Sequence, residues 1–374
     1  MSIEGKIHIR LDPGSEFPVA ISSSRPRQVM QLLQGLAPAA LQQKVPMLYA
    51  LCGKAQALAA SQALIAAGAE LRVTPKQQRD VIIEALQEYL WRFLIDLPQR
   101  LHKPPALPTL ALLRKALVQI STEPLDSDEV PYLLQKLDTS LRADFLGMST
   151  DAWLALDIAG LDNWLDQYPV ALPTGLRELR RELEQMPEVQ SEQLLLASTP
   201  DAQWLQGLGA ELASRADFAF QPNWQGKQPE TGALSYQQQQ PWLIALQQRG
   251  CSPVLLRMIA RLFELVQLRI WLDAPVEQYA SSLSGSLRLG SDTGLGWVRT
   301  ARGLLVHRVQ LAQAVVSDYQ IIAPTEWNFH PHGPLLQGLQ QWLSVASDQL
   351  PDWVGLQVLS LDPCVQYQFE VQHA

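Results

Sequence analysis

The sequence contains little cysteine and no long uncharged apolar run. Its 374 residues include three cysteines, Cys52, Cys251 and Cys364, an odd number that cannot form a disulfide framework. The opening MSIEGKIHIRL lacks the charged-then-apolar pattern of a signal peptide. No window reaches about eighteen uninterrupted apolar residues, the length that a transmembrane helix needs. We therefore expect a cytoplasmic protein with no membrane insertion.

Clusters of basic residues are also missing. Asp and Glu (37) outnumber Lys and Arg (29), the net charge is −8, and no block of five basic residues occurs. Nucleic acids and anionic membranes bind basic surfaces, so neither is an expected partner. The glycines of GSDTGLGW form neither a dinucleotide-binding nor a phosphate-binding loop, and nucleotide binding has no support.

The patterns that are present favour helices in the first two thirds of the chain. The hydrophobic content of 47% suffices for a large core. Residues 3–11 alternate as a strand does, and helical spacing follows over 27–69, with a break at Pro38 and an alanine-rich second half. A helix of about twenty residues is predicted to begin at Pro75.

The later segments differ from one another in composition. Proline-rich 101–131 is predicted to be a linker around one short helix, ALLRKALVQI. Helical pattern returns over 150–193, with Trp153 and Trp164 predicted on one face. An ordered loop over 219–236 and a long buried helix over 253–280 are expected next. Several short strands are then predicted over 283–322, where β-branched and aromatic residues stand between glycines.

Two cysteines near opposite ends of the chain are candidate metal ligands. Cys52 lies in LCGKA and Cys364 in DPCVQY. Each taken alone is most often a small buried hydrophobic residue, but thiolates suit nickel, iron or zinc. A shared site requires the C-terminal segment to return to the start of the helix that carries Cys52. We expect that helix N-terminus to lower a thiol pKa.

Several motifs occur together in a fixed order: IEGK, LCGKA, GKQPETGAL, ARGLLVH, PTEWN and DPC. In this order they resemble the large subunit of NiFe hydrogenases, at both ends and over most of the second half. The resemblance implies an α+β, predominantly helical fold with a central helix bundle and small peripheral β-sheets. It also implies one hydrogenase large-subunit-like domain, 1–374, with a divergent Pro-rich and helical insertion at about 101–218.

The ligand motifs of that family are only half retained. The family pattern supplies four thiolates from R-x-C-G-x-C-x-x-x-H and D-P-C-x-x-C-x-x-H, and here Cys52 and Cys364 match the first cysteine of each. The remaining ligand-motif positions carry residues other than Cys and His, namely Ala55, Ala59, Tyr367 and Glu370. The second cysteines bridge nickel to iron in the family, so the resemblance implies neither nickel nor hydrogen-cycling catalysis here.

Other matched residues belong to the surroundings of the iron in that family. Glu4 in SIEGK matches a proton-relay glutamate, with a plain strand-edge carboxylate as the alternative. Arg302 in TARGLL matches the arginine that donates hydrogen bonds to iron-bound cyanide, with a surface salt bridge as the alternative. Pro324 and Thr325 in PTEWN match the loop on the other side of the diatomic-ligand pocket.

The combination of lost bridging ligands and retained pocket residues is similar to the HupK/HoxV type of hydrogenase accessory protein. It implies a scaffold, not an enzyme, that transiently carries an Fe(CN)2CO fragment on Cys52 and Cys364 and delivers it to the immature hydrogenase large subunit. A small hydrogenase maturation chaperone is the other implied partner. One alternative is a chaperone with a vestigial site that docks maturation factors without metal. A second alternative is a degenerate hydrogenase.

Overall fold

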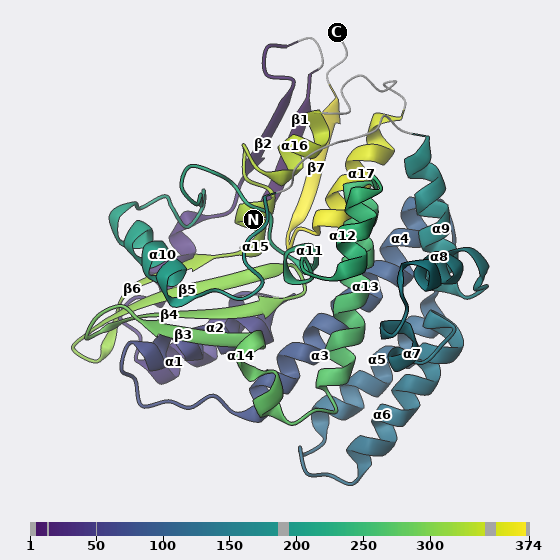
Figure 1. The fold of residues 1–374 in the computed structure, drawn as a ribbon. Coiled ribbons are helices and arrows are strands. Elements are labelled where there is room, and N and C mark those ends of the chain that lie inside the picture. Colours follow the sequence, from purple (N-terminus) through teal and green to yellow (C-terminus); the bar gives the residue numbers. More distant parts are fainter. Residues whose placement is uncertain (1–4, 13–14, 50, 186–193, 341–348, 372–374) are drawn as a thin grey trace.

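A long buried helix, α13 (Pro253–Trp271), runs through the middle of the molecule and the other elements gather around it (Figure 1). The predicted buried helix is thus confirmed, although it ends before residue 280. The computed structural model describes residues 5–12, 15–49, 51–185, 194–340 and 349–371. Within these ranges every helix is too short or too polar to cross a bilayer.

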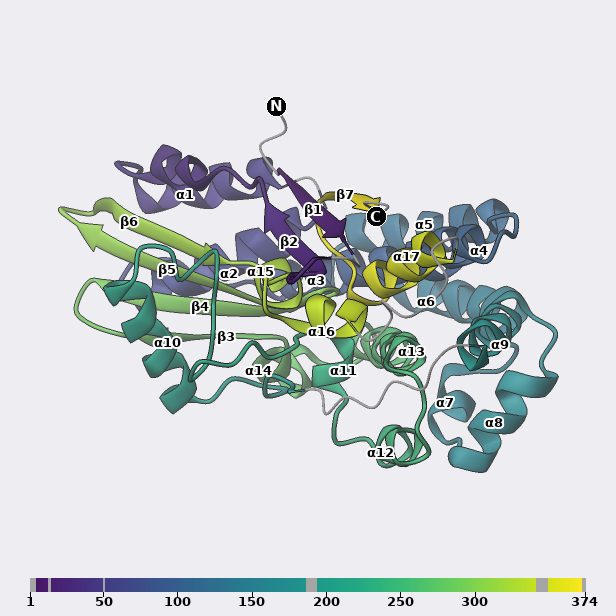
Figure 2. The ribbon, with the colours of Figure 1, turned by 90° about the horizontal axis from the view of Figure 1, so that it is seen from above.

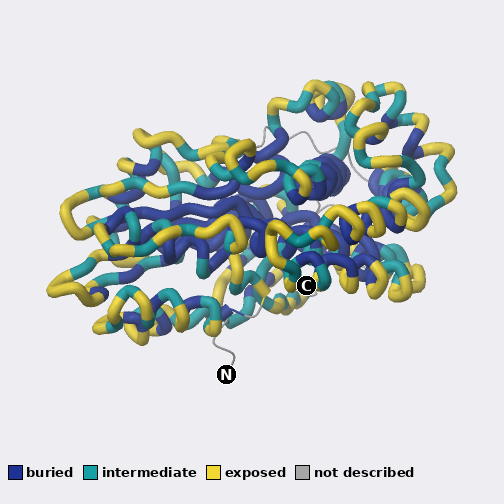
Figure 3. The backbone as a smooth tube through the Cα atoms, turned by 90° about the horizontal axis from the view of Figure 1, so that it is seen from below, coloured by how far each residue is buried: buried dark blue, intermediate teal, exposed yellow. Residues whose placement is uncertain are grey.

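Helices pack along one side of α13. They are α3 (Pro75–Trp91), α4 (Leu97–Arg100), α5 (Leu107–Thr122), α6 (Glu129–Ser140), α7 (Thr150–Leu154), α8 (Ile158–Gln167) and α9 (Ala171–Glu184). Buried residues of these helices and of α13 form one continuous hydrophobic cluster. Figure 3 shows buried backbone through the middle of the molecule and exposed backbone at its periphery. The assignment of 101–218 as an insertion stays a prediction.

The helix α3 begins where the sequence predicts. Pro75 occupies its first turn, and the Thr74 side chain accepts a hydrogen bond from the backbone N–H of Gln77, which caps the helix. A π-helical turn, Arg92–Asp96, and then α4 carry the chain on to Arg100. Single π-helical turns inside helices are frequent at functional sites.

The prediction of a linker over 101–131 is wrong for most of its length. The helix α5 has 16 residues, against the ten expected, and buries Leu110, Leu113 and Leu117 at helical spacing. Pro108 does not prevent this, because it lies in the first turn, where its missing N–H is not needed. The prediction for Trp153 and Trp164 also needs correction. They lie on separate helices, α7 and α8, and their rings meet edge to face with centroids 5.8 Å apart.

The predicted strands of 283–322 are confirmed as a four-stranded antiparallel sheet. It consists of β3 (Ser284–Arg288), β4 (Thr293–Thr300), β5 (Gly303–Ala312) and β6 (Val315–Ile322), in that order. Helix α2 (Gly53–Ala66) covers one face, and α10 (Ala202–Ser214) packs its leucines on the other (Figure 2). The strand β4 is consequently buried on both faces.

A second, smaller sheet joins the two ends of the chain. The strand β1 (Lys6–Leu11) pairs antiparallel with β2 (Val19–Ser23) and parallel with β7 (Gln366–Val371). Figure 1 shows β7 beside β1. The parallel pairing carries residues just before β7, including Cys364, back to the N-terminal half of the molecule.

The remaining helices are short or lie at the edges of the sheets. They are α1 (Pro38–Lys44), α11 (Ala233–Tyr236), α12 (Pro241–Gln248), α14 (Ala280–Leu283), α15 (Pro324–Asn328), α16 (Pro334–Gln340) and α17 (Leu350–Leu361). The segment 27–69, predicted as helical, contains a 3-10 turn (Arg27–Leu33), α1, a second 3-10 turn (Val45–Leu48) and α2 in the structure.

The close packing of α2 on β4 depends on glycine. A Cβ atom at Gly296 would collide with the backbone carbonyl of Ala59 and the backbone nitrogen of Ala63. Because both are helix backbone atoms, neither can rotate away as a side chain would. Cys52 lies immediately before α2, so this contact also sets the position of the site described below.

We expect Gly296→Ala to lower the free energy of unfolding by about 3 kcal/mol, because an overpacked contact must push α2 off the sheet. Urea denaturation monitored by circular dichroism would measure it. Gly290→Ala is the matched control at the β3–β4 turn, where a Cβ would meet only Thr293 at 4.0 Å. Equal effects of the two substitutions would contradict the close packing.

Candidate functional site

Cys52 precedes the first residue of α2 and is half-buried. Its sulfur accepts a hydrogen bond from Nε2 of Gln56, one turn further along the helix, at 3.6 Å. The two other family ligand positions on this helix, Ala55 and Ala59, are buried in the core. The helix therefore presents one thiol to the site.

The expected lowering of the Cys52 pKa by the helix N-terminus is wrong. Glu84 of α3 accepts hydrogen bonds from the backbone N–H groups of Lys54 and Ala55, at 2.8 and 3.0 Å, so a carboxylate already occupies that N-terminus. The pKa of the Cys52 thiol is raised to about 12, chiefly by burial and also by the charges of Cys364 and Glu84, against the lowering effects of Arg302 and of the hydrogen bond from Gln56. Burial also raises the pKa of Glu84 to about 7.

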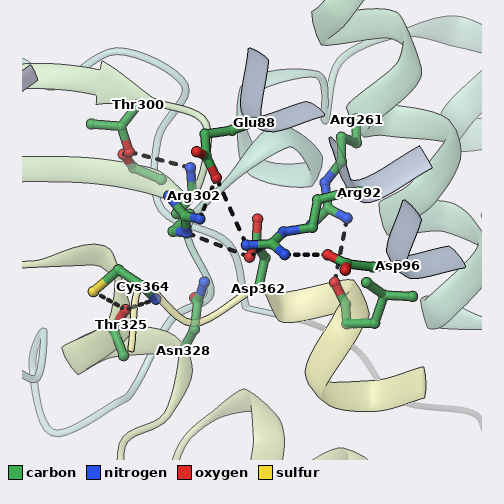
Figure 4. Close-up of polar contacts among 12 residues, drawn as sticks. Glu88, Arg92, Asp96, Arg261, Thr300, Arg302, Thr325, Asn328, Asp362 and Cys364 are labelled. Atoms are coloured by element: carbon green, nitrogen blue, oxygen red, sulfur yellow. Dashed lines mark hydrogen bonds and ion pairs between the residues drawn. The ribbon is translucent and has the colours of Figure 1, made fainter. Parts of the chain in front are cut away.

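Cys364 lies in the turn between α17 and β7, against α15. Thr325 Oγ1 donates to its sulfur at 3.1 Å and accepts from its backbone N–H at 3.2 Å (Figure 4). Arg25 Nη2 donates to the same sulfur at 3.6 Å, and Arg25 Nη1 binds Glu326 Oε1 at 2.7 Å. The C-terminal thiol therefore has a hydroxyl and a guanidinium as donors.

The structure brings most of the predicted site residues together. Cys364 is close enough to Cys52 that its charge raises the pKa of Cys52, and Arg302 interacts electrostatically with both thiols. Thr325 contacts Cys364 directly, while Pro324 is buried in the first turn of α15. The C-terminal segment has thus returned to the start of α2, as expected.

Two further residues of the site were missed by sequence reasoning. Arg25 contacts Cys364, and Tyr49 interacts electrostatically with both thiols and with Arg25. Burial raises the pKa of Tyr49, so its hydroxyl stays protonated. One feature of the sequence could have pointed to a residue such as Arg25. If the PTEWN motif is buried, its glutamate requires a positively charged partner. Glu4 lies outside the described residues.

Arg302 is buried in a cluster of charges instead of lying in a surface salt bridge. Its Nη2 donates to Glu88 Oε2 at 2.6 Å, and its Nε lies 3.4 Å from Asp362 Oδ1. Burial by itself lowers the pKa of Arg302, but Asp362 and Glu88 raise it overall. The guanidinium beside the two thiols therefore remains charged.

Asp362 of the DPC motif ties this cluster to the C-terminal thiol (Figure 4). Its Oδ1 also lies 2.8 Å from Nε of Arg92, at the start of the π-helical turn, and Arg92 in turn pairs with Asp96. Burial alone raises the pKa of Asp362, yet Arg302 and Arg92 hold it below its ordinary value. Its φ of 54° is left-handed, which ends α17 sharply ahead of Pro363.

A cavity of about 610 Å³ opens beside Cys364, between α4, α17 and β7. Its lining includes Arg92, Arg100, Asp362 and Tyr367. Tyr367 stands where the family pattern has its second C-terminal cysteine, and its hydroxyl accepts a hydrogen bond from Arg100 Nη2. Glu370, at the motif histidine position, is exposed on β7.

Within the part of the chain that the structure describes, the two thiols are the candidate metal donors of this site. Among the described residues, no three Cys, His, Asp or Glu side chains are grouped so as to hold a metal ion. Cys251 lies elsewhere, near Arg180 and Asp162, and burial raises its pKa to about 12. The site can therefore supply two thiolates to a metal that brings its other ligands with it.

Comparisons with known proteins show similarity over nearly the whole chain. A sequence model described as nickel-dependent hydrogenase matches residues 272–366. The chain is 32% identical to the hydrogenase expression/formation protein HoxV of Cupriavidus necator, over 99% of this chain and 96% of the relative. It is also 32% identical to the hydrogenase expression/formation protein HupK of Azotobacter vinelandii, over 99% of each chain.

Solved structures support the fold. The reduced Ni-Fe-Se hydrogenase from D. vulgaris Hildenborough is similar with a TM-score of 0.55 and 14% identity, covering 92% of each chain. An NAD+-reducing NiFe hydrogenase in the H2-reduced state gives a TM-score of 0.52, with the same identity and coverage. At this identity the likeness establishes the fold alone. The predicted α+β, predominantly helical class is confirmed.

We expect Asp362→Asn to lower the free energy of unfolding by about 3 kcal/mol at pH 7, because Arg302 and Arg92 lose their shared carboxylate while Glu88 and Asp96 remain as partial counter-charges. The folded-state pKa lies below 3.8, so the stabilisation is present above that pH and is lost as the pH falls through the folded-state value. The difference between wild type and variant should therefore shrink in acid. Chemical denaturation at several pH values would measure it.

Asp352→Asn is the matched control. This aspartate faces the same cavity, its side chain is 59% exposed, and its Oδ2 lies 3.8 Å from Nε2 of the exposed His102. We expect a change within about 0.5 kcal/mol. An Asp362→Asn variant as stable as this control would show that the buried charge cluster does not depend on Asp362.

Proposed function

Since the chain belongs to the HoxV and HupK family of hydrogenase expression/formation proteins, we propose that it acts in hydrogenase maturation as a scaffold that transiently carries Fe(CN)2CO. The immature hydrogenase large subunit would receive this fragment of the NiFe cofactor, and a small maturation chaperone is the second proposed partner. The fragment is cargo and not a resident cofactor. The proposal includes neither a catalytic step nor bound nickel.

One observation carries the proposal: two thiols from opposite ends of the chain lie close enough to interact electrostatically with each other and with one buried, charged arginine. Iron in Fe(CN)2CO already has three diatomic ligands, and soft thiolates are suitable for further positions. The bridging cysteines of the large-subunit pattern are replaced by Ala55 and Tyr367. A site with two thiolates suits a carrier, because the cargo must be held and then released.

The charges around the thiols also suit this cargo. Two cyanides neutralise a ferrous ion, so binding by two thiolates adds two negative charges in a poorly solvated place. Arg302 interacts with both thiols, and Arg25 donates to Cys364. Guanidinium groups are permanently charged and donate directed hydrogen bonds, which cyanide nitrogens accept. Both arginines would stabilise the loaded state more than the empty one.

Infrared spectroscopy tests the proposal. Protein isolated anaerobically from cells that contain the hydrogenase maturation machinery should show CO and CN stretching bands. Cys52→Ser and Cys364→Ser should each lose most of the band intensity per mole of protein, because each removes one of two protein ligands. Cys251→Ser is the matched control, a half-buried thiol outside the site, and should keep the wild-type bands.

Other outcomes would favour other functions. Wild-type protein without CO and CN bands would support a chaperone that docks maturation factors without metal. Bands that persist unchanged in the Cys52→Ser/Cys364→Ser double variant would rule out these thiols as ligands. Hydrogen uptake by the pure protein would indicate a degenerate hydrogenase.

A further inference from the structure

A buried chain of hydrogen bonds leads from the four-stranded sheet to Cys52. The hydroxyl of Tyr319 on β6 lies 2.6 Å from Nδ1 of His307 on β5, and Nε2 of His307 lies 2.8 Å from Oε1 of Gln56 on α2. Nε2 of Gln56 then donates to the sulfur of Cys52 at 3.6 Å. Tyr319, His307 and Gln56 are each at most 1% exposed, so water does not compete within the chain.

The chemistry of these groups sets a direction along the chain. Burial lowers the pKa of His307 to about 3, so the imidazole is neutral and carries one N–H. The amide oxygen of Gln56 can only accept, which requires the proton on Nε2 of His307. Nδ1 is then the acceptor and receives the O–H of Tyr319. Every donor therefore points toward Cys52.

The reverse direction would leave a buried hydroxyl without an acceptor. It would need a flipped Gln56 amide that donates to His307 Nε2, and a proton on Nδ1 that is donated to the Tyr319 oxygen. The O–H of Tyr319 would then have no acceptor, since His307 is its only hydrogen-bond partner in the described parts of the chain. A buried donor without a partner is costly. Tyr319 thus determines the tautomer of His307 and, through it, the orientation of the Gln56 amide.

We propose that Tyr319 and His307 are positioning residues that hold the Gln56 amide N–H on the sulfur of Cys52. A metal-bound Cys52 would then receive one directed hydrogen bond, just as Cys364 receives one from Thr325. Partners of this kind orient ligands and tune the metal. A hydrogen bond to a thiolate withdraws electron density from the iron, which weakens the iron–sulfur bond and suits a site that must release its cargo.

The direction of the chain is a property of the protein without cargo, whereas its effect on iron rests on the proposed function. Two measurements therefore follow, and the first decides the inference even when no cargo binds.

The first measurement is 15N NMR of cargo-free protein labelled at histidine nitrogens, with His307→Gln to assign the signals. We expect His307 to be neutral at pH 7 and at pH 5, with a protonated Nε2 and an unprotonated Nδ1. In Tyr319→Phe, the Nδ1 signal should shift, because that nitrogen loses its donor. Tyr89→Phe is the matched control, since this buried hydroxyl has no hydrogen-bond partner in the described residues.

An Nδ1–H tautomer or a charged imidazolium in the wild-type protein would overturn the inference. So would a Tyr319→Phe variant whose His307 signals match those of the wild type. Circular dichroism and the melting temperature of each variant would show whether the fold is retained.

The second measurement is the CO stretching band of loaded protein. We expect Gln56→Met to shift this band to lower wavenumber. Without the hydrogen bond, the sulfur of Cys52 donates more charge to iron, and iron in turn donates more charge to CO. Tyr319→Phe, which does not touch the sulfur, should shift it the same way by a smaller amount. Gln62→Met on the same helix is the control, since its amide donates to Ser284 at 3.1 Å and not to a thiol.

An unshifted CO band in both Gln56→Met and Tyr319→Phe would show that the amide does not act on the iron. A shift of equal size in Gln62→Met would assign the effect to general disturbance of α2. If the wild-type protein shows no CO band, the proposed function fails, and the NMR result still decides whether Tyr319 and His307 orient Gln56.

Discussion

Asp362 is the group on which the geometry of the site depends. Its buried carboxylate lies between buried Arg302 of the β4–β5 turn and half-buried Arg92 of the π-helical turn, and it is the one carboxylate that directly joins the C-terminal DPC motif to both guanidinium groups among the described residues. Arg261 of α13 supports the same end of α17 by donating to the carbonyls of Leu359 and Ser360. Because Cys364 follows Asp362 by two residues, these ion pairs determine where the C-terminal thiol lies.

The second constraint is the pairing of the chain ends. Register between β1 and β7 places Tyr367 opposite Ile7 and Glu370 opposite Arg10. Residues that would carry the second thiol and the histidine of the large-subunit pattern are thus parts of a regular strand. The parallel ladder stabilises the C-terminus without metal ligands, and the empty space beside it becomes the cavity next to Cys364. Tyr367 and Glu370 therefore help to form the strand β7, and they also replace two metal ligands of the large-subunit pattern.

Some features followed from local patterns and others did not. A long apolar helical pattern predicted α13, and β-branched and aromatic residues between glycines predicted the strands of 283–322, because both signals lie within the elements themselves. The length of α5 was underestimated because the prolines around its short predicted helix suggested a linker, although Pro108 is harmless in a first turn. The pKa of Cys52 was predicted in the wrong direction because burial raises it, and because Glu84, distant in sequence, occupies the helix N-terminus.

The sequence by itself determined the family, the pair of thiols and the loss of the two bridging cysteines, because motifs and their order can be read from the residues alone. Only the tertiary structure decided which charges surround those thiols. Arg25 and Glu84 belong to none of the motifs, and they reach the site through strand pairing and helix packing. Burial and electrostatic interactions depend on the distances between groups in the folded chain, and the sequence alone does not give those distances.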